Sequence, residues 1–567
     1  MLPNIIIVKI LDFLINEITC HNISSGNVNF VYNIVKVIAF VSKSWKTSIL
    51  PKITFPQTLV AEKGKIYNNL KSIRTLGANI RINAKISPLL SNYQFFQNSI
   101  VSVSDYKVRD FNQLISKSVL EEIELLVIST ELYQRVFVET DTTPQFSKLK
   151  SVHMTFPQKD VPLQSMVETL NSMSNVIENV SIKHFLNEGT TPLNSILMIK
   201  SLQKLCLNDI SLLYSAFVDV ISNHSTLNEV RLTYVSFKSG GISTYTMLDN
   251  IVLALSNNTT ITLLEFTNTF TTQLLSLELI TKYLSTNKTL KHLVMNDYMA
   301  VDPTKTFEIR NDTLERIDQY RNAEIPLIKY WASTSSLKEF RVNLFDHLNS
   351  IEALRHHSSK IVKLTVDMMY LYNERLDPHI EILKMEIPTL KYLTLNWSYS
   401  CSPVTNEDFF TAIANNKNIT SLQFENFYFV SATKLVESIS QSLKHLTILS
   451  MNHLNVKAIE DHPTEQTKFF ETIAKNPHLV SFKVHSYSEW YNSLSFDGYI
   501  DLISIVISKN NVLQHLYLPP YPKQDYTLVS NTLSNALEQN NNNLKSLHIF
   551  NQIPLHPLQK LLDKYYL

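Results

Sequence analysis

The chain has 567 residues, several times the length of a typical single domain, so we expect either several domains or one elongated array of repeats. Hydrophobic residues make up 44% of the chain and charged residues 18%, a balance that excludes a disordered protein. The net charge is +1 and the Lys and Arg residues are scattered, so the sequence offers no basic stripe of the kind that nucleic-acid binding requires.

The cysteines and the apolar segments favour an intracellular protein that is not embedded in a membrane. Cys20, Cys206 and Cys401 lie far apart, which fits a reduced protein better than a disulfide-stapled secreted one. Lys9 and Asp12 interrupt the apolar N-terminus, which is therefore unlike a signal peptide. No run of about 18 uncharged apolar residues is present, as a membrane span would need. We expect a cytoplasmic or nuclear protein.

The first elements in chain order are two predicted N-terminal helices. Pro3 suits the first turn of a helix, where its missing N–H would have had no partner. Ile6, Ile10 and Leu14 would then share one apolar face. A second helical segment ends in Val-Ser-Lys-Ser-Trp at residues 41–45. The apolar face of the first helix must be covered by another protein or by the rest of the chain.

These two segments resemble an F-box, whose members open with Leu-Pro, continue as an amphipathic helix and end in Val-x-Lys-x-Trp. The resemblance implies docking on the small adaptor subunit of a cullin-RING ubiquitin ligase. The residues that it assigns to adaptor binding are Leu2, Pro3, Ile6, Ile10, Leu11, Leu14, Val41 and Trp45. The interval from Leu14 to Trp45 is longer than usual, and Ser42 stands where Cys is common. The alternative is a plain helical cap over the open end of a repeat array.

The chain is predicted to have three parts. Residues 1–55 form the F-box-like segment, and residues 56–148 hold degenerate leading repeats with weak candidates at Leu70, Ile100 and Leu120. Residues 149–567 carry a clear repeat, a segment with apolar residues at its first, fourth and sixth positions, which predicts a short strand. The clearest copies begin at Leu202, Leu290, Leu390 and Leu513. Variants begin at Leu149, Ile177, Leu227, Ile261, Leu314, Leu337, Ile361, Ile419, Leu443, Leu479 and Leu544.

A predicted amphipathic helix precedes each strand. Phe409-Phe410 lies before the strand at Ile419, and Phe469-Phe470 lies before the strand at Leu479. An apolar residue, an Asn three positions later and the first strand residue three further on mark the end of the helix, as at Ile413, Asn416 and Ile419. Asn tolerates the left-handed conformation that ends helices, and the chain has only seven glycines for this purpose.

This pattern resembles the leucine-rich repeats of the ribonuclease-inhibitor-like type. The resemblance implies an α/β solenoid with parallel strands on the concave side and helices on the convex side, behind a small helical N-terminal segment. It departs from the family in lacking, in most copies, the Asn that usually follows the strand core. Because one unit cannot bury its own Leu positions, neighbouring units must cover them.

Residues that flank the buried strand positions should face the concave side, because side chains alternate along a strand. The candidate partner-binding residues are Glu229, Arg231, His292, Tyr392, Gln423, His445, Lys483, His485, His515, Tyr517 and His548. They form either a solvated polar surface or a protein-binding face on which Tyr and Arg act as anchors.

No catalytic, nucleotide-binding or metal-binding motif is present in the sequence, so we expect no enzymatic activity, no cofactor and no metal. The adjacent His356 and His357 would point about 100 degrees apart on a helix, and no acidic or Cys partner is spaced to complete a site. The expected function is substrate recognition within a cullin-RING ubiquitin ligase, with one protein as adaptor and another as target. The alternative is a repeat scaffold or regulator without a ligase role.

Overall fold

The chain divides into two compact units, Met1–Gln273 and Leu274–Leu567. The structure is a computed structural model, and the residues that it describes are 7–9, 11, 28–41, 43, 45–61, 65–76, 78–85, 100–104, 125–129, 148–155, 168, 170–171, 176–185, 196–197, 199–267, 275–295, 298–299, 307–319, 327–332, 336–343, 351–352, 354–355, 360–368, 377–397, 407–429, 432–442, 446–456, 462–487, 496–518, 531–539 and 543–548.

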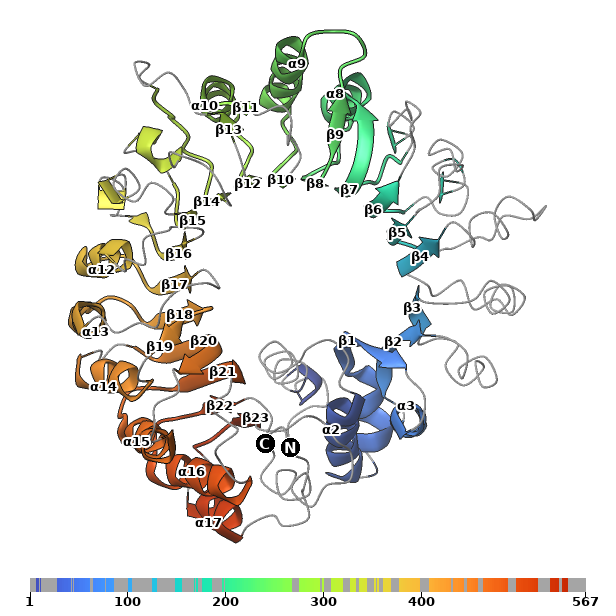
Figure 1. Cartoon of the computed structure of the whole chain (residues 1–567). Helices are drawn as coiled ribbons and strands as arrows, with labels where there is room; N and C mark the ends of the chain where they lie inside the picture. The colour runs from blue at the N-terminus through green and yellow to red at the C-terminus, as the bar shows by residue number, and fades with distance from the viewer. Residues whose placement is uncertain are drawn as a thin grey trace. The chain divides into compact units, whose positions relative to one another are not determined.

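The first unit is built on a parallel sheet whose strands pair in chain order (Figure 1). The strands of this sheet are β1 (Thr54–Ala61), β2 (Asn79–Lys85), β3 (Ile100–Ser104), β4 (Leu125–Ser129), β5 (Ser151–Thr155), β6 (Asn179–Phe185), β7 (Lys204–Leu213), β8 (Glu229–Thr233) and β10 (Leu263–Thr267). A short strand, β9 (Ser236–Lys238), pairs with the second half of β7.

The second unit repeats the same plan. Its strands are β12 (His292–Met295), β14 (Arg316–Gln319), β15 (Glu339–Asn343), β16 (Lys363–Met368), β17 (Tyr392–Trp397), β18 (Ser421–Glu425), β20 (Ile448–Val456), β21 (Ser481–Tyr487), β22 (His515–Tyr517) and β23 (Ser546–His548). Each is parallel to the next. Two short pairs stand beside this sheet: β11 (Leu275–Ser276) with β13 (Tyr298–Met299), and β19 (Tyr428–Phe429) with the end of β20.

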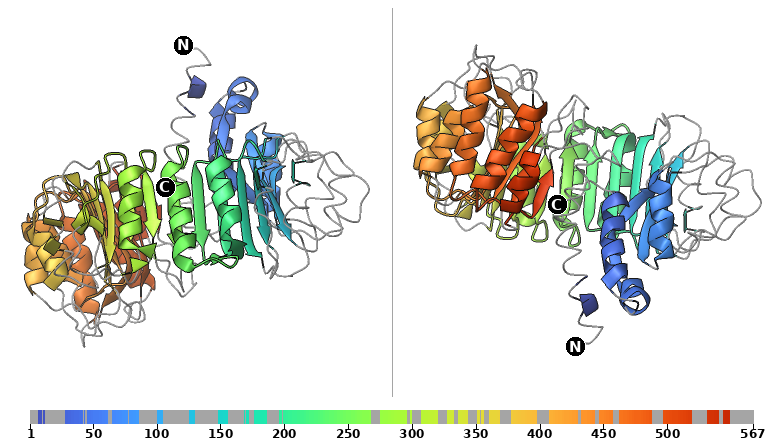
Figure 2. Two further views of the ribbon diagram at one scale, coloured as in Figure 1. Left: turned by 90° about the horizontal axis from the view of Figure 1, so that it is seen from above. Right: turned by 90° about the horizontal axis from the view of Figure 1, so that it is seen from below.

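Helices connect the strands and lie on one side of each sheet (Figure 1). In the first unit they are α2 (Val28–Val41), the π-helical turn η1 (Trp45–Ile49), the 3₁₀ turn η2 (Leu50–Lys52), α3 (Lys65–Thr75), α8 (Tyr214–Asn223) and α9 (Thr244–Asn257). In the second they are α10 (Leu277–Thr286), η8 (Leu327–Tyr330), α12 (Asp377–Lys384), α13 (Glu407–Asn415), α14 (Ala432–Ser442), α15 (His462–Lys475), α16 (Phe496–Lys509) and α17 (Asn531–Gln539). Consecutive helices from α12 to α17 pack side by side, as the orange and red helices of Figure 2 show.

The core of each unit lies between its sheet and its helices, and the predicted leucine positions line it. Leu205 is buried on β7 in register with Val180 and Val230 of the neighbouring strands. Leu393 on β17 is likewise buried in register with its neighbours Leu364 and Leu422. Each row is shielded from water only because the adjoining repeats cover it. Fully burying one such side chain stabilises the stack of repeats by roughly 1.5–3 kcal/mol. The fold is the leucine-rich-repeat solenoid that the sequence predicts.

The strand register confirms the predicted repeats, with one error. From Leu149 onward each strand begins two residues after the predicted first apolar residue, except that β20 begins at Ile448. The predicted start at Leu443 is therefore wrong by three residues, and Leu446 takes that position. Leu443, Leu446 and Ile448 match the apolar spacing as well as Leu446, Leu449 and Met451 do, so spacing alone could not separate the two registers.

The weak candidates before residue 149 have mixed outcomes. Leu70 is not in a strand but is buried in α3, so that prediction is wrong. Ile100 is the first residue of β3. Leu120 lies outside the described residues.

The Asn residues at the helix ends do not work as the sequence suggested. Asn258 and Asn287 have φ of −71° and −73°, in the extended region and not in the left-handed one. The side-chain oxygen of Asn258 instead accepts hydrogen bonds from the backbone N–H groups of Thr260 and Ile261, at 2.9 and 2.7 Å. Its amide donates to the carbonyl of Ile221, at the end of the preceding helix, at 2.8 Å. One Asn side chain thus connects two successive repeats.

The same arrangement recurs in the second unit. The Asn side chains that accept from the backbone N–H groups two and three residues later are Asn287, Asn311, Asn416, Asn476 and Asn510. Asn311 and Asn510 also donate to the carbonyls of Asn287 and Asn476, respectively. The Asn of one repeat is thus hydrogen-bonded to the backbone of the Asn in the preceding repeat. These residues are almost completely buried, where an unpaired amide would be costly.

Candidate functional site

The face of each sheet that points away from the helices carries most of the sequence-predicted binding residues, and we call it the open face. Along a strand such as β8, buried Val230 and Leu232 alternate with Glu229, Arg231 and Thr233, which are half-buried or exposed. The predicted residues with described side chains on this face are Glu229, Arg231, His292, Tyr392, Gln423, Lys483, His515 and Tyr517. The sheet backbone holds these side chains in aligned rows.

Three predicted binding residues are not placed by their side chains. His445 lies outside the described residues. His485 is in β21 and His548 is in β23, but their side chains lie outside the described part of the chain.

In the first unit, charges of alternating sign run across β7, β8 and β10. The ammonium of Lys204 lies 3.0 Å from the carboxylate of Glu229, which accepts from the guanidinium of Arg231 at 2.6 Å. Arg231 also reaches Glu265 at 3.5 Å. Burial favours the neutral form of Glu229, but Lys204 and Arg231 outweigh it and lower the pKa of this carboxyl. Cys206 lies in the same row, and burial raises the pKa of its thiol. The thiol is therefore a weak nucleophile.

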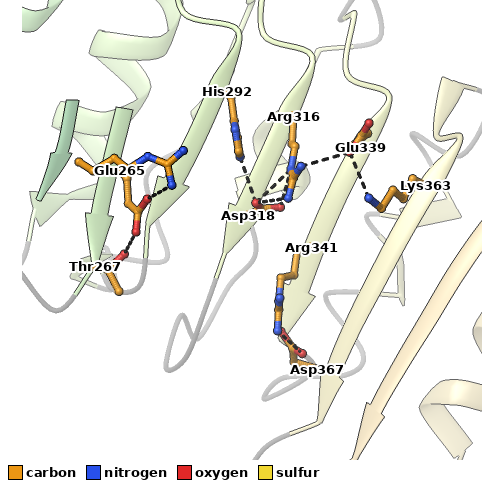
Figure 3. A network of polar contacts seen from close by, with 10 residues as sticks. Glu265, Thr267, His292, Arg316, Asp318, Glu339, Arg341, Lys363 and Asp367 are labelled. Carbon is orange, nitrogen blue, oxygen red and sulfur yellow. Dashed lines mark hydrogen bonds and ion pairs between the residues drawn. The ribbon is translucent and has the colours of Figure 1, made fainter. Parts of the chain in front are cut away.

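In the second unit, a similar network crosses β12, β14, β15 and β16 (Figure 3). Asp318 is nearly buried, 3.0 Å from the Nε2 of His292 and 2.7 Å from the guanidinium of Arg316. Arg316 continues to Glu339 at 3.6 Å, and Glu339 to Lys363 at 3.7 Å. Burial alone would raise the pKa of Asp318, but the hydrogen bonds from His292 and Arg316 lower it. Asp318 therefore stays charged.

A second chain of contacts follows the ends of β15 to β18. Arg341 donates to both carboxylate oxygens of Asp367, at 2.5 and 2.9 Å, and Asp367 is almost fully buried. The amide of Asn396 donates to Asp367, and the amide of Asn426 donates to Asn396, at 2.9 and 3.0 Å. Asn426 has a left-handed backbone, with φ of 60°, directly after its strand. Removing one member of a buried ion pair costs about 3–5 kcal/mol, so these contacts fix the geometry of the face.

The rest of the open face in the second unit, from β17 to β23, is mostly uncharged. Tyr392 is 49% exposed, and Gln423 donates to the carboxylate of Glu425 at 3.0 Å. The Nζ of Lys483 lies 4.7 Å from the centre of the Tyr517 ring, within cation–π distance. The Nδ1 of His515 and the hydroxyl of Ser546 lie 2.8 Å apart, and Ser546 also donates to the Tyr517 oxygen at 3.3 Å.

Several charged residues of the open face were missed by the sequence reasoning. They are Glu265, Arg316, Asp318, Glu339, Arg341, Lys363 and Asp367. A signal for most of them was available, because Arg316 and Asp318 hold the same two positions of their repeat as Glu229 and Arg231 do of theirs. Their pairing was not visible, since most of it joins residues of neighbouring strands, either directly opposite or diagonally, and depends on the exact register.

The predicted adaptor-binding residues are described only in part. Leu2, Pro3, Ile6, Ile10 and Leu14 lie outside the described residues. Leu11 is helical and half-buried, and Trp45 opens η1, also half-buried. Val41 ends α2 and is 55% exposed, next to Phe40, which is 74% exposed. Val31, Val35 and Ile38 of α2 are buried, and the helix packs on α3 and β1.

Two negative observations apply only to the part of the chain that the structure describes. No group of three His, Cys, Asp or Glu side chains is placed to hold a metal ion. No helix is long and apolar enough to cross a bilayer. His356 and His357 fall outside those residues. The open face carries hydrogen-bonding, ionic and aromatic side chains.

Comparison with known proteins gives only distant structural similarity. No protein-family model matches the chain, and no curated protein matches it in sequence. The chain is similar to the crystal structure of the Rad7 and Elc1 complex from yeast, with a TM-score of 0.36 and 13% identity, over 76% of this chain and 94% of that one. It is also similar to the leucine-rich-repeat protein LegL7 from Legionella pneumophila, with a TM-score of 0.32 and 15% identity, over 63% of this chain and 96% of that one.

Proposed function

We propose that this chain binds a protein partner through its open face and performs no chemistry of its own. The observation that supports this most is the alignment of polar, ionic and aromatic side chains in rows on a rigid parallel sheet, in both units. Extended repeat surfaces of this kind suit recognition of a macromolecule, because they hold many contact residues in fixed positions. Tyr and Arg, which often dominate binding energy, are exposed on it at Arg231 and Tyr392.

Proximity labelling with the full chain tests this proposal. Arg231→Glu in the first unit and Tyr392→Asp in the second each place a new charge on the open face. The matched control is Leu253→Asp on α9, since Leu253 is an apolar residue 53% exposed on the helical side. We expect proteins that are labelled by the original chain and the control but lost with at least one open-face variant. Identical labelling by all four chains contradicts the proposal.

In its finer form, the proposal makes the chain a substrate-recognition subunit of a cullin-RING ubiquitin ligase. The N-terminal resemblance to an F-box motivates this role, and the exposure of Phe40 and Val41 beside the buried side of α2 is compatible with it. The open face would then hold the target protein. The alternative is a repeat scaffold or regulator in which α2 only caps the sheet, and the burial of Val31, Val35 and Ile38 fits this role equally well.

Binding of the purified ligase adaptor to the full chain separates the two roles. We expect the original chain to retain the adaptor, and Ile10→Asp or Val41→Asp to lose it. Leu253→Asp is again the control, because its exposure is close to that of Val41. An original chain that folds but does not bind the adaptor removes the ligase role and leaves the scaffold role.

A further inference from the structure

The charges on the open face of the second unit are distributed unequally. From β12 to β16 the cations Arg316, Arg341 and Lys363 each lie within ion-pair distance of a carboxylate on the same face. Asp318 and Asp367 are nearly buried, so these carboxylates are already satisfied within the chain. This half of the face has little uncompensated charge to offer a partner.

The half from β17 to β23 differs, because its cation Lys483 is not paired with a carboxylate among the described residues. Among the described residues, no Asp or Glu lies within ion-pair distance of Lys483, whose ammonium stands over the Tyr517 ring. Burial lowers the pKa of Lys483, as expected for a partly buried amine that no carboxylate compensates. An incoming carboxylate would remove this cost and complement the charge.

An aromatic anchor lies on the same half. Tyr392 is 49% exposed on β17, and β18 and β20 separate it from β21, which carries Lys483. Three strand spacings correspond to about 15 Å, which an extended peptide covers with about five residues. Between these strands the same face carries Gln423, whose amide donates to the half-buried Glu425 at 3.0 Å, and Ser450, which is buried.

We propose that the partner presents an acidic segment to the second unit, in which an Asp or Glu side chain pairs with Lys483 and an apolar side chain about four positions away, on the same face of the extended segment, packs on Tyr392. This inference rests on the proposed function, since it names the partner's chemistry on the same face. It commits to a carboxylate as the anion.

Selection of random displayed peptides on the immobilised full chain tests the inference. We expect enriched peptides that contain Asp or Glu, and a loss of affinity of about tenfold for a synthetic member of this pool when Lys483 is changed to Gln. Tyr392→Ala should weaken the same peptide. The matched control is Lys363→Gln, because Lys363 is on the same face but already paired with Glu339, and it should leave the affinity unchanged.

A charge exchange guards against a folding defect. Lys483→Glu should lose the acidic peptide and gain the peptide in which the acidic residue is replaced by Lys. Peptides that depend on open-face residues but show no acidic preference overturn this inference and leave the proposed function intact. Absence of any peptide that depends on the open face overturns both. Binding about tenfold tighter with phosphoserine in the acidic position assigns the site to phosphate and overturns the carboxylate.

Discussion

His379 links the stability of the fold to pH through one residue. Its imidazole is fully buried on α12, edge-on to Phe427 at 5.7 Å, and burial lowers its pKa from 6.5 to about 3. Between pH 6.5 and about pH 3, the imidazole of His379 is therefore protonated in the unfolded chain but neutral in the folded chain. The free energy of unfolding is therefore highest above pH 6.5, and it decreases as the pH falls from there towards 3.

We expect the free energy of unfolding to decrease by about 2 kcal/mol when the pH is lowered from 7 to 5, because of His379. The substitution His379→Leu should remove this decrease. Urea denaturation of both chains at the two pH values measures the difference. Phe427→Leu is the control, because it weakens the same packing without removing a titrating group and should keep the pH dependence. Equal pH dependence in the original chain and in His379→Leu would show that the imidazole is not the source.

At the scale of an element, Asn416 follows the last residue of α13 and connects this helix to the preceding repeat by hydrogen bonds. Its oxygen accepts from the N–H groups of Asn418 and Ile419, and its amide donates to the carbonyl of Leu383 at the end of α12, at 3.1, 3.2 and 3.0 Å. Asn416→Ala should cost about 2–3 kcal/mol, because buried backbone groups lose their partners. The neighbouring Asn415 is exposed, so Asn415→Ala should change stability by less than about 0.5 kcal/mol.

Asn416→Gly distinguishes this account from a purely conformational one. Gly adopts the left-handed conformation freely, so it would restore stability if that conformation were the reason for Asn. We expect it to destabilise the chain at least as much as Ala does. Chemical denaturation of the three variants makes the comparison, and stability retained by the Gly variant would refute the hydrogen-bonding role.

The elements show how far the sequence could predict the fold. Apolar spacing located the strands from Leu149 onward because each strand buries alternate residues against helices of similar pattern. It failed at Leu443, where two overlapping registers fit equally well. The position of Asn416 was also predicted, but its role was not, since its partner carbonyl belongs to the preceding repeat, and the similar Asn311 was not predicted. Of the site, single residues such as Tyr392 and Lys483 were predicted, whereas ion pairs such as that of Arg341 with Asp367 depend on a register that spacing does not give.

At the scale of the whole molecule, a stack of repeats should respond locally to damage. Leu393 on β17 is buried between Leu364 and Leu422, so Leu393→Asp places an unpaired charge between neighbouring repeats. We expect faster hydrogen–deuterium exchange in β16, β17 and β18, with protection retained in β7 and β8. Peptide-level mass spectrometry reads both regions. Uniform loss of protection along the chain would indicate one cooperative core and not a repeat array.

The central claim is that the partner contacts the sheet and not the helices, and amine-reactive cross-linking to a partner recovered by proximity labelling tests it most directly. Exposed or half-buried lysines lie on both sides of the chain. Those on the open face include Lys183, Lys204, Lys363 and Lys483, and those on the helices include Lys282, Lys434 and Lys475. We predict cross-links from the partner to the open-face lysines of at least one unit. Cross-links confined to the helical lysines would contradict the account.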